Sequence, residues 1–234
     1  MRPRHYLLAL TAAAALPFTA AAETHYKPRI TLGARAGMSL GRTSFSPSVR
    51  QGWVTGSTGA VTFSYTEEKL FGLVAELGWI TRGWSENFTD PYAAPNPLRY
   101  SRSLTYLRLP LLTHIYFGPP RFKAFVNLGP EIGYMLGSSI SSNFDYRNPT
   151  ADPNWPVRNR MTEQLTMDIT GRFDYGISAG AGGEFFLTPS QSITIEARYY
   201  FGLGNIFPSS KADIFSASRP SSIEVTLGYN FRVR

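Results

Sequence analysis

The chain has 234 residues and a formal net charge of +7, a length that suits one barrel or sandwich or two small domains. It contains no cysteine, so disulfide bonds, thiolate metal sites and cysteine nucleophiles are excluded. Although 43% of the residues are hydrophobic, no apolar run reaches the roughly 20 residues that a membrane-spanning helix needs. Any crossing of a membrane would therefore be built from strands.

The first 22 residues have the order of a secretory signal peptide. Arg2 and Arg4 form a basic head, residues 6–16 are apolar, and alanines 20–22 precede Glu23. We expect residues 1–22 to be removed on export and residues 23–28 to form a short lead into the folded part. A short amphipathic helix is the alternative. No cysteine follows the apolar stretch, which excludes a lipoprotein anchor.

From Arg29 onward, segments alternate between apolar and other residues. Alternation with a period of two over about ten residues is typical of strands in outer-membrane barrels. The predicted strands are 29–40, 58–66, 69–82, 104–117, 121–137, 165–187, 191–203 and 222–233. We therefore predict an all-β fold, an eight-stranded antiparallel up-and-down transmembrane β-barrel over residues 29–234.

The connections between these strands alternate in length. The short ones are 66–69, 118–121 and 188–191, and the long ones are 41–57, 83–103, 138–164 and 204–221. Up-and-down barrels of the outer membrane have short periplasmic turns and long outer loops in this order. A soluble β-sandwich offers no reason for such sorting.

The two faces of the predicted strands differ in charge. One face is a continuous series of apolar and aromatic residues without a charge. The other carries Arg35, Glu76, Arg108, Glu131, Asp174, Glu184, Glu196, Arg198, Glu224 and Arg232. Because a lipid-facing Arg or Lys at mid-bilayer costs about 2–4 kcal/mol, we expect the apolar face outward and the charged face inward. A soluble lipocalin-like carrier, with the opposite orientation, is the alternative.

The charged face also predicts what fills the barrel. Eight strands enclose a space just wide enough for side chains. We expect a core of ion pairs centred on Glu196 and Arg198, with a narrow channel as the alternative.

Aromatic residues of the apolar face fall into two groups, as expected where rings meet two membrane interfaces. The group expected at the periplasmic end is Tyr65, Phe71, Phe117, Phe122, Phe185 and Phe231. The group expected near the outer end is Trp79, Tyr134, Phe173 and Phe201.

Candidates for catalysis are scarce. Beyond the predicted signal peptide the histidines are His25, before the barrel, and His114, expected to face inward near the periplasmic end. A hydrogen-bonded interior role is favoured for His114. Residues 180–183 lack the Lys-Ser/Thr of a phosphate-binding loop, and their glycines are expected to ease curvature or make room for interior side chains. We predict no catalytic, cofactor or metal site, with a lipid-modifying or proteolytic barrel enzyme as the alternative.

The long predicted loops carry more basic than acidic residues. The basic ones are Arg42, Arg50, Arg82, Arg99, Arg102, Arg147, Arg158, Arg160, Lys211 and Arg219. A modestly positive outer surface suits anionic lipopolysaccharide headgroups, so lipopolysaccharide and outer-membrane lipid are the expected partners. Nucleic-acid binding would need a clustered basic patch and is not expected.

Several stretches resemble the small porin-like outer-membrane barrels called PorT-like. They are LTYLRLPLLTHIYF (104–117), KAFVNLGPEIGYMLG (123–137), FDYGISAGAGGEFFL (173–187) and ITIEARYYFGLGNIF (193–207). Arg108 departs from the family pattern, which has an acidic residue there. The resemblance implies a bacterial outer-membrane barrel and, for some members, a part in protein secretion, so secretion-system proteins are further expected partners. TLGYNF (226–231) is similar to the C-terminal signal read by the barrel-insertion machinery.

These expectations combine into one functional prediction. The chain is expected to be a non-enzymatic structural or assembly component of the bacterial outer membrane, with a link to secretion implied by the PorT-like resemblance.

Overall fold

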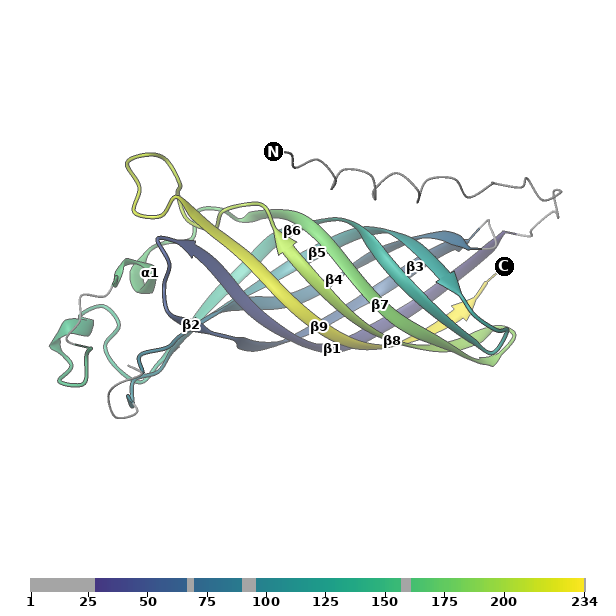
Figure 1. Cartoon of the computed structure of the whole chain (residues 1–234), viewed down its shortest axis with the longest axis horizontal. Coiled ribbons are helices and arrows are strands. Elements are labelled where there is room, and N and C mark those ends of the chain that lie inside the picture. Colours follow the sequence, from purple (N-terminus) through teal and green to yellow (C-terminus); the bar gives the residue numbers. More distant parts are fainter. Residues whose placement is uncertain (1–27, 67–69, 90–95, 157–160, 234) are drawn as a thin grey trace, which may run out of the picture.

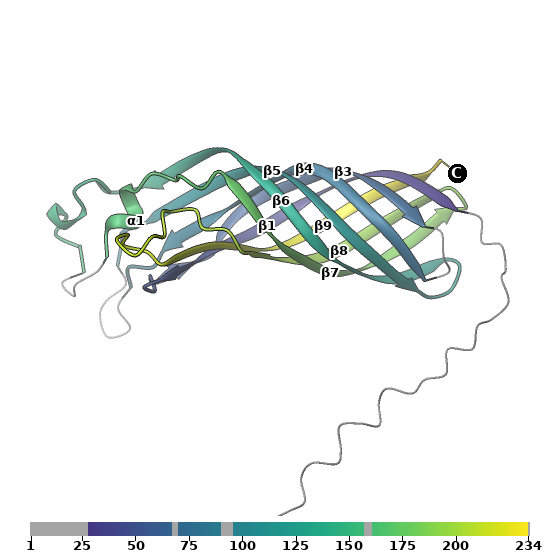
Figure 2. The same cartoon turned by 90° about the horizontal axis from the view of Figure 1, so that it is seen from above.

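The computed structural model describes residues 28–66, 70–89, 96–156 and 161–233. The predicted signal peptide 1–22, most of the lead 23–28, with His25, and turn residues 67–69 lie outside the described residues. The described part is a closed barrel of antiparallel strands, drawn out along its axis and with its strands tilted (Figures 1 and 2).

Eight strands form the ring, and each pairs with its neighbours along the chain. They are β1 (Arg29–Ser46), β3 (Val54–Thr66), β4 (Phe71–Glu86), β5 (Tyr100–Phe117), β6 (Phe122–Ser142), β7 (Phe173–Thr188), β8 (Gln191–Gly202) and β9 (Ala217–Arg232). Pairing of β1 with β9, in which Ala34 faces Tyr229, closes the ring. The predicted eight-stranded up-and-down barrel is confirmed.

Three short elements lie outside the ring. The strand β2 (Gln51–Gly52) pairs with the end of β4. The 3-10 helix η1 (Pro149–Ala151) and the helix α1 (Glu163–Thr166) lie in the connection from β6 to β7. Among the described residues, no helix has the length and apolar character needed to cross a membrane.

Short and long connections lie at opposite ends of the barrel. The turns from β5 to β6 and from β7 to β8 are at the end where β1 begins and β9 ends, and the long connections, with α1, are at the other (Figure 1). Gly118 permits the β5–β6 turn because its φ is +134° and a Cβ there would lie 2.6 Å from the carbonyl oxygen of Phe122. The two ends are called the short-turn end and the long-loop end below.

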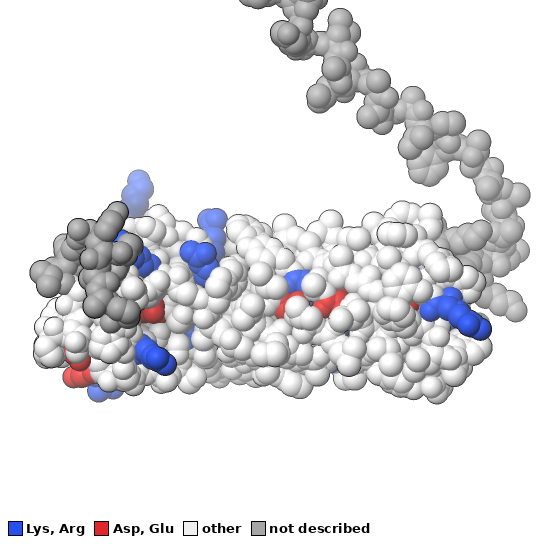
Figure 3. Space-filling view, turned by 60° about the horizontal axis from the view of Figure 1, so that its bottom comes forward, with Lys and Arg blue, Asp and Glu red and all other residues white. Residues whose placement is uncertain are grey.

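The apolar face points outward. Met38, Leu73 and Leu227 are 62%, 61% and 61% exposed, whereas Arg108 and Arg198 are 1% exposed. In the space-filling view, charged side chains gather at the two ends, and the middle is uncharged apart from one small group of charged atoms (Figure 3). This is the orientation expected in lipid, so the lipocalin-like alternative is wrong.

Most strands are longer than predicted at the long-loop end. β1 continues to Ser46 instead of residue 40, β4 to Glu86 instead of 82, and β6 to Ser142 instead of 137. β3, β5 and β9 begin at 54, 100 and 217, earlier than the predicted 58, 104 and 222. The predicted strand 165–187 was too long, because α1 lies at 163–166 and β7 begins at Phe173.

The extra strand length has a physical cause in side-chain polarity. Along β1 the outward residues beyond Leu40 are Arg42, Ser44 and Ser46, while the inward Phe45 is 6% exposed. The alternation therefore continues with its sense reversed, polar outward and apolar inward. We call these strand ends the stem; they comprise residues 41–46, 54–58, 80–86, 100–106, 137–142 and 217–222.

Candidate functional site

The interior is occupied by an ion-pair network whose first part joins β1, β4 and β8. Arg198 on β8 donates from Nη1 to Oε2 of Glu76 (2.9 Å) and from Nη2 to Oε1 (2.8 Å). Its Nε donates to Oε1 of Glu196 at 3.0 Å. Arg35 on β1 donates from Nη1 to Glu76 (2.9 Å) and to Glu196 (2.6 Å). Two guanidinium groups and two carboxylates thus form a neutral set.

A second part of the network lies between β5 and β9. Arg108 donates from Nη1 and Nη2 to the two carboxylate oxygens of Glu224 at 2.7 and 2.8 Å, the parallel geometry that guanidinium and carboxylate groups favour. Its Nη2 also donates to Oγ1 of Thr58 on β3 at 2.9 Å. Glu224 lies 3.6 Å from Nη2 of Arg35, which connects this part with the first.

The third part surrounds Arg82 on β4. Its Nη1 donates to Oδ2 of Asp174 at 2.9 Å, its Nη2 to Glu131, and its Nε to Oγ of Ser222 at 3.1 Å. The guanidinium carbon lies 3.6 Å from the ring centre of Tyr200, a cation–π contact. Glu131 is 3.6 Å from Arg108, so one continuous network receives side chains from every strand of the ring.

The charges of this network nearly cancel, and its side chains are buried. Four arginines face five carboxylates, and each of the nine residues is 8% exposed or less. Removing one partner of such a buried pair strands the other charge, at a cost of about 3–5 kcal/mol. The network therefore makes the barrel depend on complete charge pairing.

Eight of the ten predicted interior residues belong to this network, and Glu184 and Arg232 lie apart from its centre. Glu184 accepts a hydrogen bond from Oγ of Ser192 at 2.6 Å and lines a cavity at the short-turn end, as does Arg232. The carboxylates around Arg198 are Glu76, Glu196 and Glu224. Glu184 is therefore not among the carboxylates that pair with Arg198.

Arg82 is the network residue that the sequence analysis missed. It was assigned to a loop, as were Arg42, Arg102 and Arg219, and all four lie in strands. Arg82 is an even number of residues from Glu76, so it shares the inward face of β4. Arg82 is the last residue of the predicted strand 69–82, so applying that spacing to the whole predicted strand would have found it.

Above the network, toward the long-loop end, the interior is apolar. We call this cluster the aromatic plug; it consists of Phe45, Ile80, Trp84, Leu104, Tyr106, Met135, Ile206, Phe207 and Phe215. The ring of Phe45 lies 5.2 Å from that of Trp84, edge to face, and 5.2 Å from that of Phe215. Trp84, Phe215 and Leu104 are 0% exposed. Closely packed rings therefore fill the bore at this level.

The connection from β6 to β7 covers the plug. Tyr100 donates from its hydroxyl to the carbonyl oxygen of Leu165 at 2.8 Å, and Arg102 donates from Nη1 to that of Met167 at 2.7 Å. Leu165 in α1 is 0% exposed and packs in a second cluster with Phe88, Leu98 and Tyr100. The loop is thereby held across the long-loop end of the barrel.

The predicted aromatic groups all lie on the outward face. Phe71, Phe117, Phe122, Phe185 and Phe231, 36–58% exposed, and the partly exposed Tyr65 are near the short-turn end. Trp79, Tyr134, Phe173 and Phe201, 45–58% exposed, lie where the apolar band gives way to the stem. Trp79 and Tyr134 are thus well inside their strands, because the stem extends beyond them. That both groups mark membrane interfaces stays a prediction.

His114 lies in the interior near the short-turn end. Its Nδ1 is 2.7 Å from Oδ1 of Asn127, whose Nδ2 donates to Oε1 of Glu196 at 3.0 Å. This hydrogen-bonded arrangement agrees with the interior role favoured from the sequence. Within the described ranges, no group of three or more His, Cys, Asp or Glu residues is arranged to hold a metal ion.

Of the glycines at 180–183 in the wall of β7, Gly180 and Gly182 make room for interior side chains. A Cβ at Gly180 would be 2.7 Å from Oε1 of Glu196, and one at Gly182 would be 2.5 Å from the ring of Phe125. The expectation that these glycines accommodate interior groups is confirmed.

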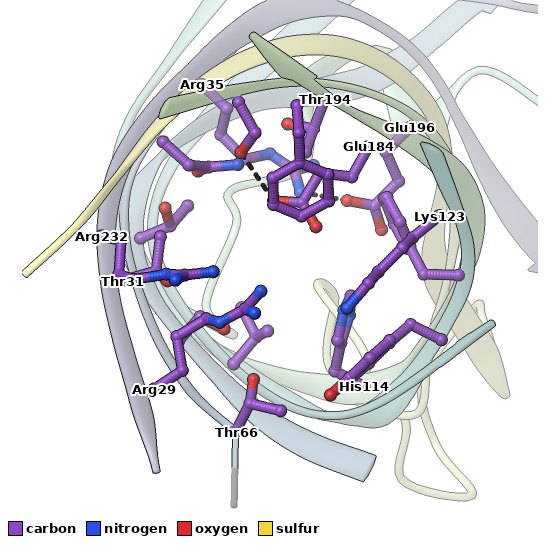
Figure 4. Close-up of a pocket in the computed structure, with 18 of the residues that line it drawn as sticks. Arg29, Thr31, Arg35, Thr66, His114, Lys123, Glu184, Thr194, Glu196 and Arg232 are labelled. Carbon is purple, nitrogen blue, oxygen red and sulfur yellow. Dashed lines mark hydrogen bonds and ion pairs between the residues drawn. The ribbon is translucent and has the colours of Figure 1, made fainter. Parts of the chain in front are cut away.

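A cavity of about 80 Å³ lies at the short-turn end. Figure 4 shows Arg29, Arg232 and Lys123 directed into it from different sides, with Glu184, Glu196 and Arg35 along its wall. The floor is the neutral set formed by Arg35, Glu76, Glu196 and Arg198. This cavity and the filled bore above it are the two interior features that bear on the function of the chain.

In a comparison with solved structures, this chain is similar to small outer-membrane barrels. Neisserial surface protein A is 12% identical with a TM-score of 0.45, over 86% of this chain and 96% of that one. OprG from Pseudomonas aeruginosa is 11% identical with a TM-score of 0.47 (87% and 96%). Ail, the attachment invasion locus protein of Yersinia pestis, is 11% identical with a TM-score of 0.39 (86% and 98%). Likenesses at this level carry no conclusion about function.

No curated protein sequence matches this chain significantly. Residues 21–208, well over half of the 234-residue chain, match the family described as outer membrane protein beta-barrel domain. With its closed antiparallel ring and outward apolar face, the chain belongs to this family of the bacterial outer membrane.

Proposed function

We propose that this chain is a non-enzymatic structural barrel that carries a rigid stem above the outer leaflet. The observation that supports this is the length of the strands. A strand crosses the membrane with about 9–11 residues, whereas β1, β5 and β6 have 18, 18 and 21. The surplus forms the stem, whose outward residues are hydroxyl-bearing and basic and whose interior is the aromatic plug.

The filled interior favours a structural role over a channel or an enzyme. The ion-pair network and the aromatic plug occupy successive levels of the bore. His114 is hydrogen-bonded to Asn127 near the short-turn end, whereas a lipid-modifying or proteolytic site would need an acid–base partner at the outer rim.

Two outward arginines of the stem, Arg42 and Arg219, are the proposed contact for the phosphates of lipopolysaccharide. Leu40 on β1 pairs with Ile223 on β9, and both are outward and apolar. In the next two outward rows, Arg42 pairs with Ser221 and Arg219 with Ser44. Diagonal neighbours of this kind have Cβ atoms roughly 7–8 Å apart, a spacing that one phosphate can bridge. The arginines begin directly above the apolar band, where the phosphates of lipopolysaccharide lie in an outer leaflet.

The test uses the mature chain refolded in a maltoside detergent. Added lipopolysaccharide should raise the temperature at which the folded form is lost, since a ligand of the folded state alone stabilises it. Arg42→Gln with Arg219→Gln should reduce this shift, whereas Arg121→Gln, at the short-turn end, should leave it unchanged. Equal shifts in parent and double variant would reject lipopolysaccharide contact at this site.

An assembly role linked to secretion rests on the PorT-like resemblance of residues 104–137 and 173–207. Co-purification of the tagged chain from native membranes, with the bound proteins identified by mass spectrometry, tests it. Enrichment of secretion-system proteins would support the link, and recovery of the barrel-insertion machinery alone would contradict it.

A further inference from the structure

The cavity at the short-turn end has the features of an anion site. Its wall carries hydroxyl groups, such as those of Thr31, Thr66 and Thr194, among apolar side chains (Figure 4). Its volume of about 80 Å³ is several times the roughly 10–15 Å³ that one water molecule needs. A group with four oxygen atoms therefore fits inside.

Positive charge dominates the mouth of this cavity. Arg29, Lys123 and Arg232 line it, and Glu184 is the carboxylate at their level. The two carboxylates of the floor, Glu76 and Glu196, are already matched by Arg35 and Arg198. The mouth thus has a surplus of two positive charges among the residues that the structure describes, which do not include Glu67, Glu68 and Lys69.

The cations come from separate strands and converge. Arg29 belongs to β1, Lys123 to β6 and Arg232 to β9, and Figure 4 shows their side chains reaching toward the same space. Lys123 lies 4.2 Å over the ring of Tyr116, and Arg29 lies 5.9 Å over that of Phe186. Such ring contacts orient a cation.

We propose that this cavity binds a phosphoryl group that enters from the periplasm. Arg29 and Arg232 offer planar pairs of N–H donors, and Lys123 offers a compact charge, the combination with which proteins hold phosphate. A phosphate dianion neutralises the surplus charge, and its oxygens are numerous enough for all three cations. The phosphoryl group belongs either to a free phosphate ion or to a phospholipid headgroup of the periplasmic leaflet.

The experiment titrates the mature barrel, refolded in a maltoside detergent, with inorganic phosphate and follows binding by calorimetry. Saturable binding is expected in the parent. The triple variant Arg29→Gln, Lys123→Gln, Arg232→Gln should bind at least about tenfold more weakly, as expected when charge-assisted hydrogen bonds are lost. The matched control Arg99→Gln, Arg147→Gln, Lys211→Gln removes the same charge from exposed side chains at the opposite end and should bind as the parent does.

Single variants keep the test valid if the triple variant does not refold. Arg29→Gln and Arg232→Gln should each weaken phosphate binding several-fold, and Lys123→Arg should retain it. No saturable binding to the parent of either phosphate or phospholipid, or equal binding by the variants and the control, would overturn the proposal.

Native mass spectrometry with added phosphatidylglycerol distinguishes the two sources. A bound phospholipid that the parent keeps, the triple variant loses and inorganic phosphate displaces identifies the headgroup. Phosphate binding without such a lipid identifies the free ion. Lipid bound equally by parent and triple variant, together with no phosphate binding, rejects the site.

Discussion

Arg198 and Glu76 join opposite walls of the barrel through two parallel hydrogen bonds of 2.9 and 2.8 Å. Their strands, β8 and β4, are separated in the ring by three strands on either side. The pair therefore crosses the bore. This contact across the bore couples the pairing of these charges to the closed shape of the barrel.

Replacing Arg198 should destabilise the barrel. Arg198→Leu leaves three guanidinium groups against five carboxylates in the network, so we expect a loss of about 3–5 kcal/mol in the free energy of unfolding. Urea unfolding in lipid vesicles, followed by the difference in gel mobility between unboiled and boiled samples, measures it. The double variant Arg198→Leu, Glu76→Leu should lose less than the sum of the single variants. A more stable Arg198→Leu would invert the assignment of the two faces.

The membrane-spanning part of the fold could be predicted from the sequence because strand residues that face lipid must be apolar. The outward residues there are uncharged and nearly all apolar, with Thr113 as an exception, so Ile30, Leu32 and Ala34 alternate cleanly with their inward neighbours. The same rule placed eight of the ten predicted interior charges in the network. Arg108, a departure from the resembled family, takes its place by binding Glu224.

The stem could not be predicted in this way, because outward residues that face water need not be apolar. Beyond Leu40 the outward positions tolerate Arg42 and Ser44, and the inward positions hold Phe45. The reversed pattern resembles that of a polar loop with scattered aromatic residues, which is why the aromatic plug was missed. The cavity at the short-turn end depends on which strands meet in space, and sequence spacing does not supply that.

The aromatic plug should contribute strongly to stability. Trp84→Ala removes a side chain that is 0% exposed and should cost about 3–5 kcal/mol. Trp79→Ala is the matched control, because Trp79 on the same strand is 48% exposed on the outward face. Urea unfolding of both variants measures the difference. Equal losses would mean that the plug is not packed as described.

The barrel should not conduct ions. Side chains of the network and the plug fill the bore, and eight strands leave little more than the space they occupy. Planar-bilayer recordings of the refolded parent should show negligible steady conductance. A stable open level in the parent would reject the filled interior.

Loop topology can be tested because the chain has no cysteine. Single cysteines at Ser48, Asn96, Asn154 and Ser210, in the long connections, should react with a membrane-impermeant maleimide on intact cells. A cysteine at Ser190, in the turn between β7 and β8, should react only after the outer membrane is opened, and so should one at Glu67. Equal labelling at all six positions would contradict the separation of the two ends.

A cysteine scan along the outward positions of β1 tests the central claim most directly, that an apolar band sits in lipid and a stem stands above it. Positions Ala34, Ala36 and Met38 lie in the band, and Arg42, Ser44 and Ser46 lie in the stem. With a water-soluble maleimide added to intact cells, we predict labelling at the stem positions and protection at the band positions, with the change between Leu40 and Arg42. Labelling at Ala36 and Met38, or protection at Ser44 and Ser46, would contradict the account.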